Sequence, residues 1–337
     1  MRMLRYGLIG FAQGYYATTY TRVAAARKDV EVVGVCDLGQ PADYVEACAE
    51  LTAERFAEEL GVPLYHELDE LLGKNLDAVM ITSETCEHAE HVLAAVKRGV
   101  HAMIGKPMTL RADEVKQVIQ TAAGKPLIIL PGEPARYEDG IIAAREQIAR
   151  GAIGRPIMGR VFVNHPAMVN HDWERDEKRS GGPLGEFGYY CCDLIRWIMG
   201  AEPAEVFAYA KNFCTPEIQS PDNLKILVRF TNGSLGSMDC SSSIQFNYPF
   251  LDLECIGETG VVRTQYHNYP AVMQCADRVE LAPIRYSPMN EREMHHFLDC
   301  VQGKDKPRIL LRDALQVARM IDAIRESLRL HKPVSLA

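Results

Sequence analysis

Residues 6–15, Tyr6-Gly7-Leu8-Ile9-Gly10-Phe11-Ala12-Gln13-Gly14-Tyr15, are predicted to form an apolar strand over Tyr6–Gly10 and then a glycine-containing turn. A helical pattern follows to about Arg27, and Val30–Asp37 is a second apolar run. Its continuous apolar character is expected of a strand that is buried on both faces of a sheet. This order of strand, turn, helix and strand indicates the first βαβ unit of a parallel sheet.

The same alternation continues to about residue 130. The further predicted strands are Leu76–Thr82, His101–Ile104 and Pro126–Leu130, and the predicted helices between them are Thr52–Leu60, Glu84–Arg98 and Arg111–Ala123. Repeated βαβ units with short connections favour a right-handed, doubly wound sheet. We therefore expect a dinucleotide-binding Rossmann domain over residues 1–130. The stretch Leu38–Leu51 has no predicted role.

From residue 131 the pattern changes to one dominated by β signals. Strands are expected within Pro156–Asn164, Glu205–Lys211, Lys225–Ser243, Leu251–Tyr266 and Ala271–Leu281, and helices within Asp139–Gly151, Gly188–Met199 and Glu291–Leu330. Asn232-Gly233 is a strong hairpin turn between two alternating runs. The predicted fold class is thus α/β, with a second, α+β domain over residues 131–337 that is built on a large, mostly antiparallel sheet.

Composition restricts the kinds of partner. The chain has 337 residues, a formal net charge of −8 and a pI of about 5.7, and an acidic surface repels nucleic acids and anionic membranes. No apolar run approaches the ~20 residues that cross a bilayer, and the start lacks a signal-peptide pattern, so we expect a cytoplasmic protein. The ten cysteines are scattered without a Cys-x-x-Cys pair. We expect reduced, mostly buried thiols and no metal site.

The turn Gly10-Phe11-Ala12-Gln13 is the predicted nucleotide site. The dinucleotide fingerprint would place glycines at positions 10, 12 and 15, and only Gly10 matches. Asp37 ends the next strand, where a carboxylate can accept hydrogen bonds from ribose hydroxyls and repels a 2′-phosphate. No Arg or Lys follows in Leu38-Gly39-Gln40. These features predict NAD rather than NADP, although Asp37 as a simple strand-end cap is the structural alternative.

Lys106 is the strongest candidate for chemistry. It follows the strand His101–Ile104 in the turn Gly105-Lys106-Pro107, and ligands bind at the carboxyl ends of the strands in an open α/β sheet. Pro107 removes a backbone donor and stiffens the turn. The alternative is a solvated lysine in a surface turn.

A larger set of motifs supports a family resemblance. It consists of Thr82-Ser83 followed by His88, Ala94–His101, Gly105-Lys106-Pro107, Arg136-Tyr137, Trp173 with Asp176, Ser180–Gly188, Asp193–Trp197 and Pro333-Val334. With these motifs the chain resembles, over nearly its whole length, the glucose–fructose oxidoreductase/inositol dehydrogenase (Gfo/Idh/MocA) family of NAD(P)-dependent sugar and cyclitol oxidoreductases. The resemblance implies hydride transfer between a secondary alcohol and nicotinamide, with Lys106 catalytic. It also implies that Thr82, Ser83, His88 and Lys106 contact the cofactor.

Two departures from the family pattern concern the proton-transfer groups. The family often pairs the lysine with an aspartate and, four residues later, a histidine, whereas this chain has Glu186 and Tyr190. A spacing of four places both side chains on one helical face. A phenol with a pKa near 10 can act as general acid/base when an ammonium group stabilises its phenolate. The alternative is that Tyr190 packs under the sheet and Glu186 is a solvated acid. Glycine at position 105 also replaces the glutamate that usually precedes the Lys-Pro pair.

The substrate side of the site is less defined. Candidates to line a sugar or polyol pocket are Arg136, Asn164, His165, Asp172 and Trp173. The resemblance further implies a homodimer or homotetramer formed through the C-terminal sheet. Two alternatives to a dehydrogenase remain: an NAD-dependent glycoside-cleaving enzyme of the same fold, and a non-catalytic sensor of sugars or dinucleotides.

Overall fold

The chain forms two compact units. The computed structural model describes residues 2–39, 51–165, 172–216, 218–243, 250–266, 270–281 and 288–336. The first unit consists of Met1–Gly132, Asn170–Gly181 and Asn290–Leu315, and the second of Glu133–Val169, Gly182–Met289 and Gln316–Ala337. The first unit is therefore discontinuous in sequence, because two later segments pack with the residues that were predicted to bind the dinucleotide.

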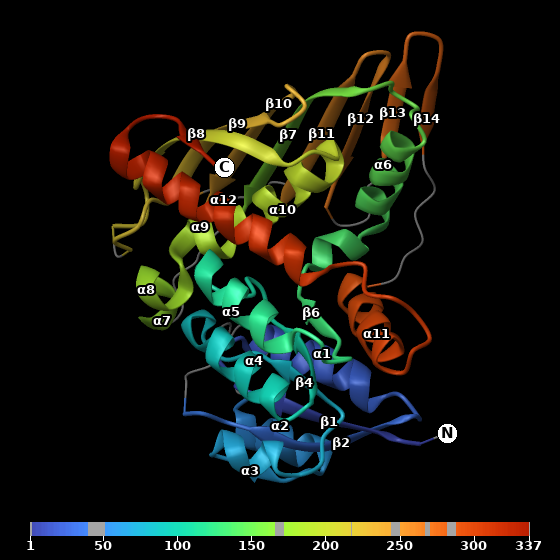
Figure 1. The fold of residues 1–337 in the computed structure, drawn as a ribbon, viewed down its shortest axis with the longest axis vertical. Coiled ribbons are helices and arrows are strands. Elements are labelled where there is room, and N and C mark those ends of the chain that lie inside the picture. Colours follow the sequence, from blue (N-terminus) through green and yellow to red (C-terminus); the bar gives the residue numbers. More distant parts are fainter. Residues whose placement is uncertain are drawn as a thin grey trace. The chain divides into compact units, whose positions relative to one another are not determined.

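The first unit is built on a six-stranded parallel sheet with strand order β3-β2-β1-β4-β5-β6 (Figure 1). Its strands are β1 (Leu4–Ile9), β2 (Val30–Cys36), β3 (Leu64–Tyr65), β4 (Ala78–Ile81), β5 (His101–Ile104) and β6 (Ile129–Pro131). The helices that connect them are α1 (Gly14–Ala25), α2 (Ala53–Leu60), α3 (Leu68–Leu72), the 3₁₀ turn η1 (Thr85–Glu87), α4 (His88–Lys97) and α5 (Ala112–Ala122). This is the predicted doubly wound order of a Rossmann sheet.

Local sequence explains where these elements begin and end. The Thr52 side chain accepts a hydrogen bond from the Arg55 N–H and caps α2, and Gly61 ends this helix at a φ of 66°. All four residues of β4 are buried, as the continuous apolar run indicates for a central strand. The short β3 and α3 have too few residues to show a periodicity, and the sequence did not predict them.

The second unit is built on a nine-stranded sheet in the order β14-β13-β12-β11-β7-β10-β9-β8-β15. Its strands are β7 (Pro156–Asn164), β8 (Pro203–Lys211), β9 (Asn223–Phe230), β10 (Leu235–Ser241), β11 (Leu251–Gly257), β12 (Gly260–Gln265), β13 (Val272–Cys275), β14 (Val279–Leu281) and β15 (Val334–Ser335). Among the described strands only β7 and β10 pair in parallel, so the sheet is mostly antiparallel, as predicted. The Asn232-Gly233 turn joins β9 and β10, with Gly233 at a φ of 83°.

One face of this sheet is covered by helices and the other is open within the described residues. Figure 1 shows α10 (Gly188–Met199) and α12 (Leu311–Leu330) against the sheet, and α6 (Asp139–Ala149) packs on β12 and β13. Along β9 the residues alternate: Leu224 and Ile226 are buried, whereas Lys225 and Leu227 are exposed. The alternation follows the two-residue period of a strand and identifies the covered face.

The remaining elements are short or lie outside the predicted ranges. They are η2 (Pro134–Tyr137), α7 (Asp172–Arg175), α8 (Glu177–Ser180) and α9 (Gly182–Glu186), together with α11 (Met289–Val301), which with α12 accounts for the predicted helical region Glu291–Leu330. Of the stretch Leu38–Leu51, residues 40–50 lie outside the described residues. The nine described cysteines are free. No helix within the described ranges is long and apolar enough to span a membrane.

Candidate active site

The parallel register brings the predicted nucleotide residues to one edge of the first unit's sheet. Ile9 pairs with Cys36 of β2 and with Ile81 of β4, and Ile81 pairs with Ile104 of β5. The residues that follow these strand ends are Gly10, Asp37, Thr82 and Gly105. The Gly10 turn, Asp37 and the segment that carries Lys106 therefore lie at the same carboxyl edge of the sheet, as the sequence predicted.

Gly10 is required by its surroundings as well as by its backbone. Its φ is +76°, and a Cβ at this position would lie 2.5 Å from both the Cα and the N of Ser83. The Gly10 N–H donates to the Cys36 carbonyl at 2.9 Å, and its own carbonyl accepts from the Thr82 hydroxyl at 2.7 Å. The turn is thus held between two neighbouring strands, with space for a glycine alone.

Helix α1 begins directly after this turn. Its N-cap residue is Gln13, whose side chain makes no capping bond, so N–H groups of the first turn have no side-chain partner at the N-cap. Such a helix start favours an anion such as a pyrophosphate. Ala12 is buried, and the Phe11 ring packs 5.8 Å from that of Phe56. Phe11 therefore contributes its side chain to the core, which leaves its backbone for the turn.

Asp37 lies beside Gly10 at the end of β2. Its N–H donates to the Tyr65 carbonyl at 2.9 Å, and one carboxylate oxygen accepts from the Gly39 N–H at 3.0 Å. The side chain is half-buried, and the carboxylate retains acceptor capacity for ribose hydroxyls. Asp37 both caps the strand end and suits ribose recognition.

His88 joins the turn after β4 to the turn after β5. Its ring is fully buried, with Nδ1 2.9 Å from the Pro107 carbonyl and Nε2 3.0 Å from the Ser83 carbonyl. Ser83 in turn places its hydroxyl 2.7 Å from Nδ1 of His91, a residue that no sequence motif indicated. Burial lowers the pKa of His88 and of His91 to about 4. Both ring nitrogens of His88 thus contact protein carbonyls, and this arrangement positions the Lys106 turn.

Lys106 is almost fully buried, with 6% of its surface exposed. The Lys106–Pro107 peptide is cis. The Lys106 carbonyl accepts a hydrogen bond from Nε2 of Gln13 at 3.0 Å, and its ammonium lies 5.9 Å from the centre of the Tyr16 ring. This distance is within the range of a cation–π contact. Tyr16 is a neighbour of the lysine that no sequence motif indicated.

Asp172 and Trp173 belong to the first unit. Trp173 is buried, and its indole N–H has no hydrogen-bond partner among the described residues. Asp172 is exposed and lies 3.8 Å from the Arg175 guanidinium. The following helix α8 is anchored by an ion pair between Arg179 and the buried carboxylate of Glu84, just after β4.

The second unit brings other predicted residues together at the end of β7. The His165 ring stacks on Phe187 with 4.7 Å between ring centres, and Phe250 meets both His165 and Tyr190 edge-on. Asn164 is buried, and neither atom of its amide has a partner among the described residues. Glu186 is also buried, so it is not the solvated acid of the alternative. Tyr190 is buried in the core of the second unit, which agrees with the alternative that it packs under the sheet. Phe250, which is central to this cluster, was not predicted.

Arg136 has a different position from the one expected of a substrate contact. Its guanidinium makes two hydrogen bonds to the Asp193 carboxylate and lies 5.2 Å from the centre of the Trp197 ring. The two charged side chains are 5% and 2% exposed. Arg136 is therefore engaged in an ion pair inside the second unit.

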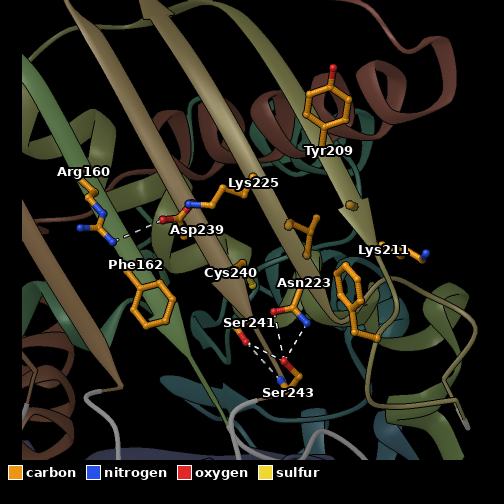
Figure 2. Close-up of a pocket in the computed structure, with 13 residues that line it drawn as sticks. Arg160, Phe162, Tyr209, Lys211, Asn223, Lys225, Asp239, Cys240, Ser241 and Ser243 are labelled. Atoms are coloured by element: carbon orange, nitrogen blue, oxygen red, sulfur yellow. Dashed lines mark hydrogen bonds and ion pairs between the residues drawn. The ribbon is translucent and has the colours of Figure 1, made fainter.

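A cavity of about 650 Å³ lies on the open face of the nine-stranded sheet. Figure 2 shows aromatic and polar side chains around it, among them Phe162 of β7, Tyr209 of β8, Asn223 of β9 and Ser243 just after β10. Asp239 in its wall is bound by Arg160 and Lys225. No predicted catalytic residue lines this cavity.

Comparison with known proteins identifies the family. A family profile described as "Oxidoreductase family, NAD-binding Rossmann fold" matches residues 4–133, and the "GFO/IDH/MocA C-terminal domain" matches residues 141–263. Together they cover more than half of the chain. The chain belongs to the Gfo/Idh/MocA family. It is thus an NAD-binding oxidoreductase, which confirms the predicted enzyme class and fold.

Individual relatives within the Gfo/Idh/MocA family are at modest identity. A myo-inositol 2-dehydrogenase of Thermotoga maritima is 31% identical over 196 residues, which cover 57% of this chain and 58% of that protein. A scyllo-inositol 2-dehydrogenase (NAD(+)) of Bacillus subtilis is 24% identical over 295 residues, which cover 84% and 85%. The crystal structure of a probable dehydrogenase from Thermotoga maritima has a TM-score of 0.82 at 25% identity and covers 99% of both chains.

The carboxyl edge of the first unit fits the cofactor of this family. Gly10 leaves a space that any Cβ would fill, the start of α1 favours a pyrophosphate, and Asp37 follows β2, where a carboxylate can accept hydrogen bonds from a ribose.

Proposed function

We propose that this protein is an NAD-dependent dehydrogenase that transfers a hydride between nicotinamide and a secondary alcohol of a sugar, cyclitol or related polyol. The observation that carries the proposal is the position of Lys106, whose turn follows β5 at the same sheet edge as Gly10 and Asp37. The names of the inositol dehydrogenase relatives support the substrate class.

The cofactor is assigned to the edge residues. Gly10, Phe11, Ala12 and Gln13 form the turn that would hold the pyrophosphate, and Asp37 would bind the adenosine ribose. Thr82, Ser83 and His88 shape the neighbouring turn through their hydrogen bonds. When bound, the nicotinamide accepts or supplies the hydride. Asp37 and the absence of a cation in Leu38-Gly39 favour NAD over NADP.

Lys106 and Tyr190 are the proposed catalytic pair. The ammonium of Lys106 holds the substrate oxygen and stabilises its developing negative charge, while Tyr190 in its phenolate form takes the hydroxyl proton and becomes the neutral phenol. Glu186 is a third polar group on the short helix before α10. The unpartnered amide of Asn164 is suited to bind a substrate hydroxyl, and His165, Asp172 and Trp173 remain proposed contacts. Arg136 is proposed to support the site through Asp193.

The Lys106→Ala substitution tests the lysine. We expect turnover to fall by at least about 100-fold because an oriented charge-stabilising group is lost, with the Kd for NAD nearly unchanged. Lys97→Ala is the matched control, since Lys97 is exposed at the end of α4. Turnover of Lys106→Ala equal to that of the wild type would remove this mechanism.

The Tyr190→Phe substitution tests the proton acceptor separately, because it deletes one hydroxyl and keeps the ring. We expect kcat to fall by roughly 10²–10⁴-fold. Tyr189→Phe is the control, since this neighbouring tyrosine is equally buried. Equal effects of the two substitutions on kcat would contradict the assignment of the base.

The reaction itself is tested by NADH absorbance with NAD and a panel of inositols, aldoses, anhydrosugars and glycosides. NADH formation that is lost in Lys106→Ala supports the dehydrogenase. Release of sugar from a glycoside without net NADH supports glycoside cleavage, and NAD binding without any turnover supports a sensor. Tighter binding of NADP than of NAD in a titration would overturn the cofactor preference.

We also propose that copies of the chain associate through the open face of the nine-stranded sheet. Exposed apolar side chains on this face support it, including Tyr209, 66% exposed, and Leu227, 61% exposed. Light scattering of wild type and Leu227→Lys tests for a homodimer or homotetramer; an unchanged mass would exclude Leu227 from the interface. A cytoplasmic location, and the lack of nucleic-acid and membrane partners, remain predictions from charge and sequence.

A further inference from the structure

Gln13 connects the nucleotide turn to the Lys106 turn. Its side chain is 1% exposed, and its Nε2 donates to the Lys106 carbonyl at 3.0 Å. The backbone of Gln13 is fixed as well, because its N–H donates to the Thr82 carbonyl and its carbonyl accepts from the Ala17 N–H, both at 2.9 Å. A rigid residue of the nucleotide turn therefore holds the backbone of the proposed catalytic lysine.

The orientation of the Gln13 amide follows from its partner. A carbonyl accepts hydrogen bonds only, so the nitrogen must face Lys106. The other amide atom, Oε1, is buried and has no hydrogen-bond partner among the described residues. An unsatisfied buried acceptor destabilises the folded state. An apolar side chain of similar shape would remove this unsatisfied acceptor but leave the Lys106 carbonyl without its donor, so the hydrogen bond to Lys106 is what glutamine specifically provides here.

Gly105 provides the space that Gln13 occupies. A Cβ on Gly105 would lie 1.9 Å from Oε1 and 3.1 Å from Cδ of Gln13. Gly105 is not among the described glycines with positive φ, so its neighbour, rather than its backbone conformation, excludes a larger residue. The side chains at positions 13 and 105 thus compete for one volume.

We propose that Gln13 is a positioning residue for Lys106, and that glycine at position 105 is the steric condition for this role. The inference rests on the proposed function of Lys106. The hydrogen bond from Gln13 to the Lys106 carbonyl fixes the backbone of Lys106. The Gly10–Gln13 turn, which would bind the pyrophosphate, thereby also determines the position of the Lys106 side chain. A displacement of a catalytic group by about 1 Å lowers turnover by up to ~100-fold.

Two substitutions of Gln13 separate positioning from packing. Gln13→Met keeps the length of the side chain and removes the donor, and Gln13→Glu keeps the shape but has only acceptors when ionised. We expect kcat to fall roughly 10- to 100-fold in both. For Gln13→Met we expect the Kd for NAD to stay within about threefold and Tm within about 3 °C, because loss of the donor is offset by loss of the unsatisfied acceptor.

A readout without substrate or cofactor keeps this test independent of the proposed reaction. Lys106 is labelled by reductive methylation in the cofactor-free protein and quantified by peptide mass spectrometry, with Lys97 as internal reference. We expect the rate at Lys106 to rise at least about threefold in both variants, because loss of the anchor allows the turn to open. An unchanged rate at Lys106 in both variants overturns the proposal. Absence of turnover in the wild type with every polyol would instead contradict the proposed function.

The shared volume is tested by a reciprocal pair. Gly105→Ala alone should lower Tm by at least about 3 °C, because it overpacks a buried contact. Adding Gln13→Ala should restore most of that loss in Tm and leave the high labelling rate at Lys106. If the loss of Tm in the double variant equals the sum of the losses in the two single variants, the side chains at positions 13 and 105 do not compete for one volume. This comparison does not use Gln13→Met, so it can be made even if that variant does not fold.

Discussion

Replacing Arg136 by methionine while Asp193 stays in place tests whether Arg136 supports the fold or contacts a substrate. Two hydrogen bonds join the guanidinium to the carboxylate, and the side chains are 5% and 2% exposed. Removal of one partner leaves a buried charge without compensation, which costs about 3–5 kcal/mol. Methionine still covers the Trp197 ring, 5.2 Å from the guanidinium carbon. The expected loss therefore reflects the unpaired Asp193.

The assay uses the two tryptophans of the chain, which lie in different units: Trp173 in the first and Trp197 in the second. In a Trp173→Phe background, fluorescence during urea unfolding reports the second unit alone. With a slope of about 2 kcal/mol per M, a loss of about 4 kcal/mol lowers the unfolding midpoint by about 2 M.

A double-mutant cycle completes this test. The variant Arg136→Met/Asp193→Leu removes both charges, and we expect its free energy of unfolding to be within about 1.5 kcal/mol of the background. A loss below about 1 kcal/mol for Arg136→Met alone, or a double variant equal to the sum of the singles, would refute the reasoning. A higher KM for substrate without any loss of stability would return Arg136 to the substrate pocket.

Two further predictions concern the nucleotide edge. Burial lowers the pKa of His88 and His91 from 6.5 to about 4. Between pH 6.5 and pH 4 the unfolded chain therefore binds more protons than the folded protein. The free energy of unfolding is thus at its full value above pH 6.5 and decreases toward pH 4, by up to about 3 kcal/mol per histidine. Urea midpoints across this pH range measure the loss, and a flat profile would contradict it. Gly10→Ala should weaken NAD binding at least about tenfold, since its Cβ would lie 2.5 Å from the Ser83 backbone. Gly99→Ala is the control by calorimetry, because Gly99 has a similar φ of +75° and open space around it.

The sequence predicted the parts of the fold that depend on local patterns. Continuous apolar runs identified β2, β4 and β5, and Asn232-Gly233 identified a hairpin, because burial and positive φ restrict residue choice. Burial on both faces holds for β4 but not for the first half of β2, where Glu31 is exposed. The sequence did not predict that Asn170–Gly181 and Asn290–Leu315 join the first unit. That outcome depends on tertiary packing between segments far apart in the chain.

The candidate site likewise contains residues that local patterns predicted and residues that only tertiary packing brings together. Gly10, Asp37 and Lys106 were predicted to share an edge because parallel strands end together, and the register bears out that arrangement. Tyr16 and Phe250 were missed, since each meets its partner only through the fold. The Arg136–Asp193 pair spans 57 positions, and no spacing rule relates such residues.

Only one of the three fingerprint glycines is present in this chain, but the structure shows that the two missing glycines do not exclude a dinucleotide site. A glycine is indispensable where φ is positive or where another backbone approaches, and both conditions hold at position 10. Position 12 is occupied by a buried alanine, and Tyr15 lies within α1 with its hydroxyl accepting from Asn290 at 3.0 Å. The glycine that matches the fingerprint is thus the one that geometry enforces, while the other two positions accept side chains that pack within the first unit. Because its contact with Ser83 requires glycine at position 10 with or without a nucleotide, Gly10 alone does not separate a dehydrogenase from a sensor. Asp37, which follows β2 at the same edge, is the residue that specifically suits a dinucleotide.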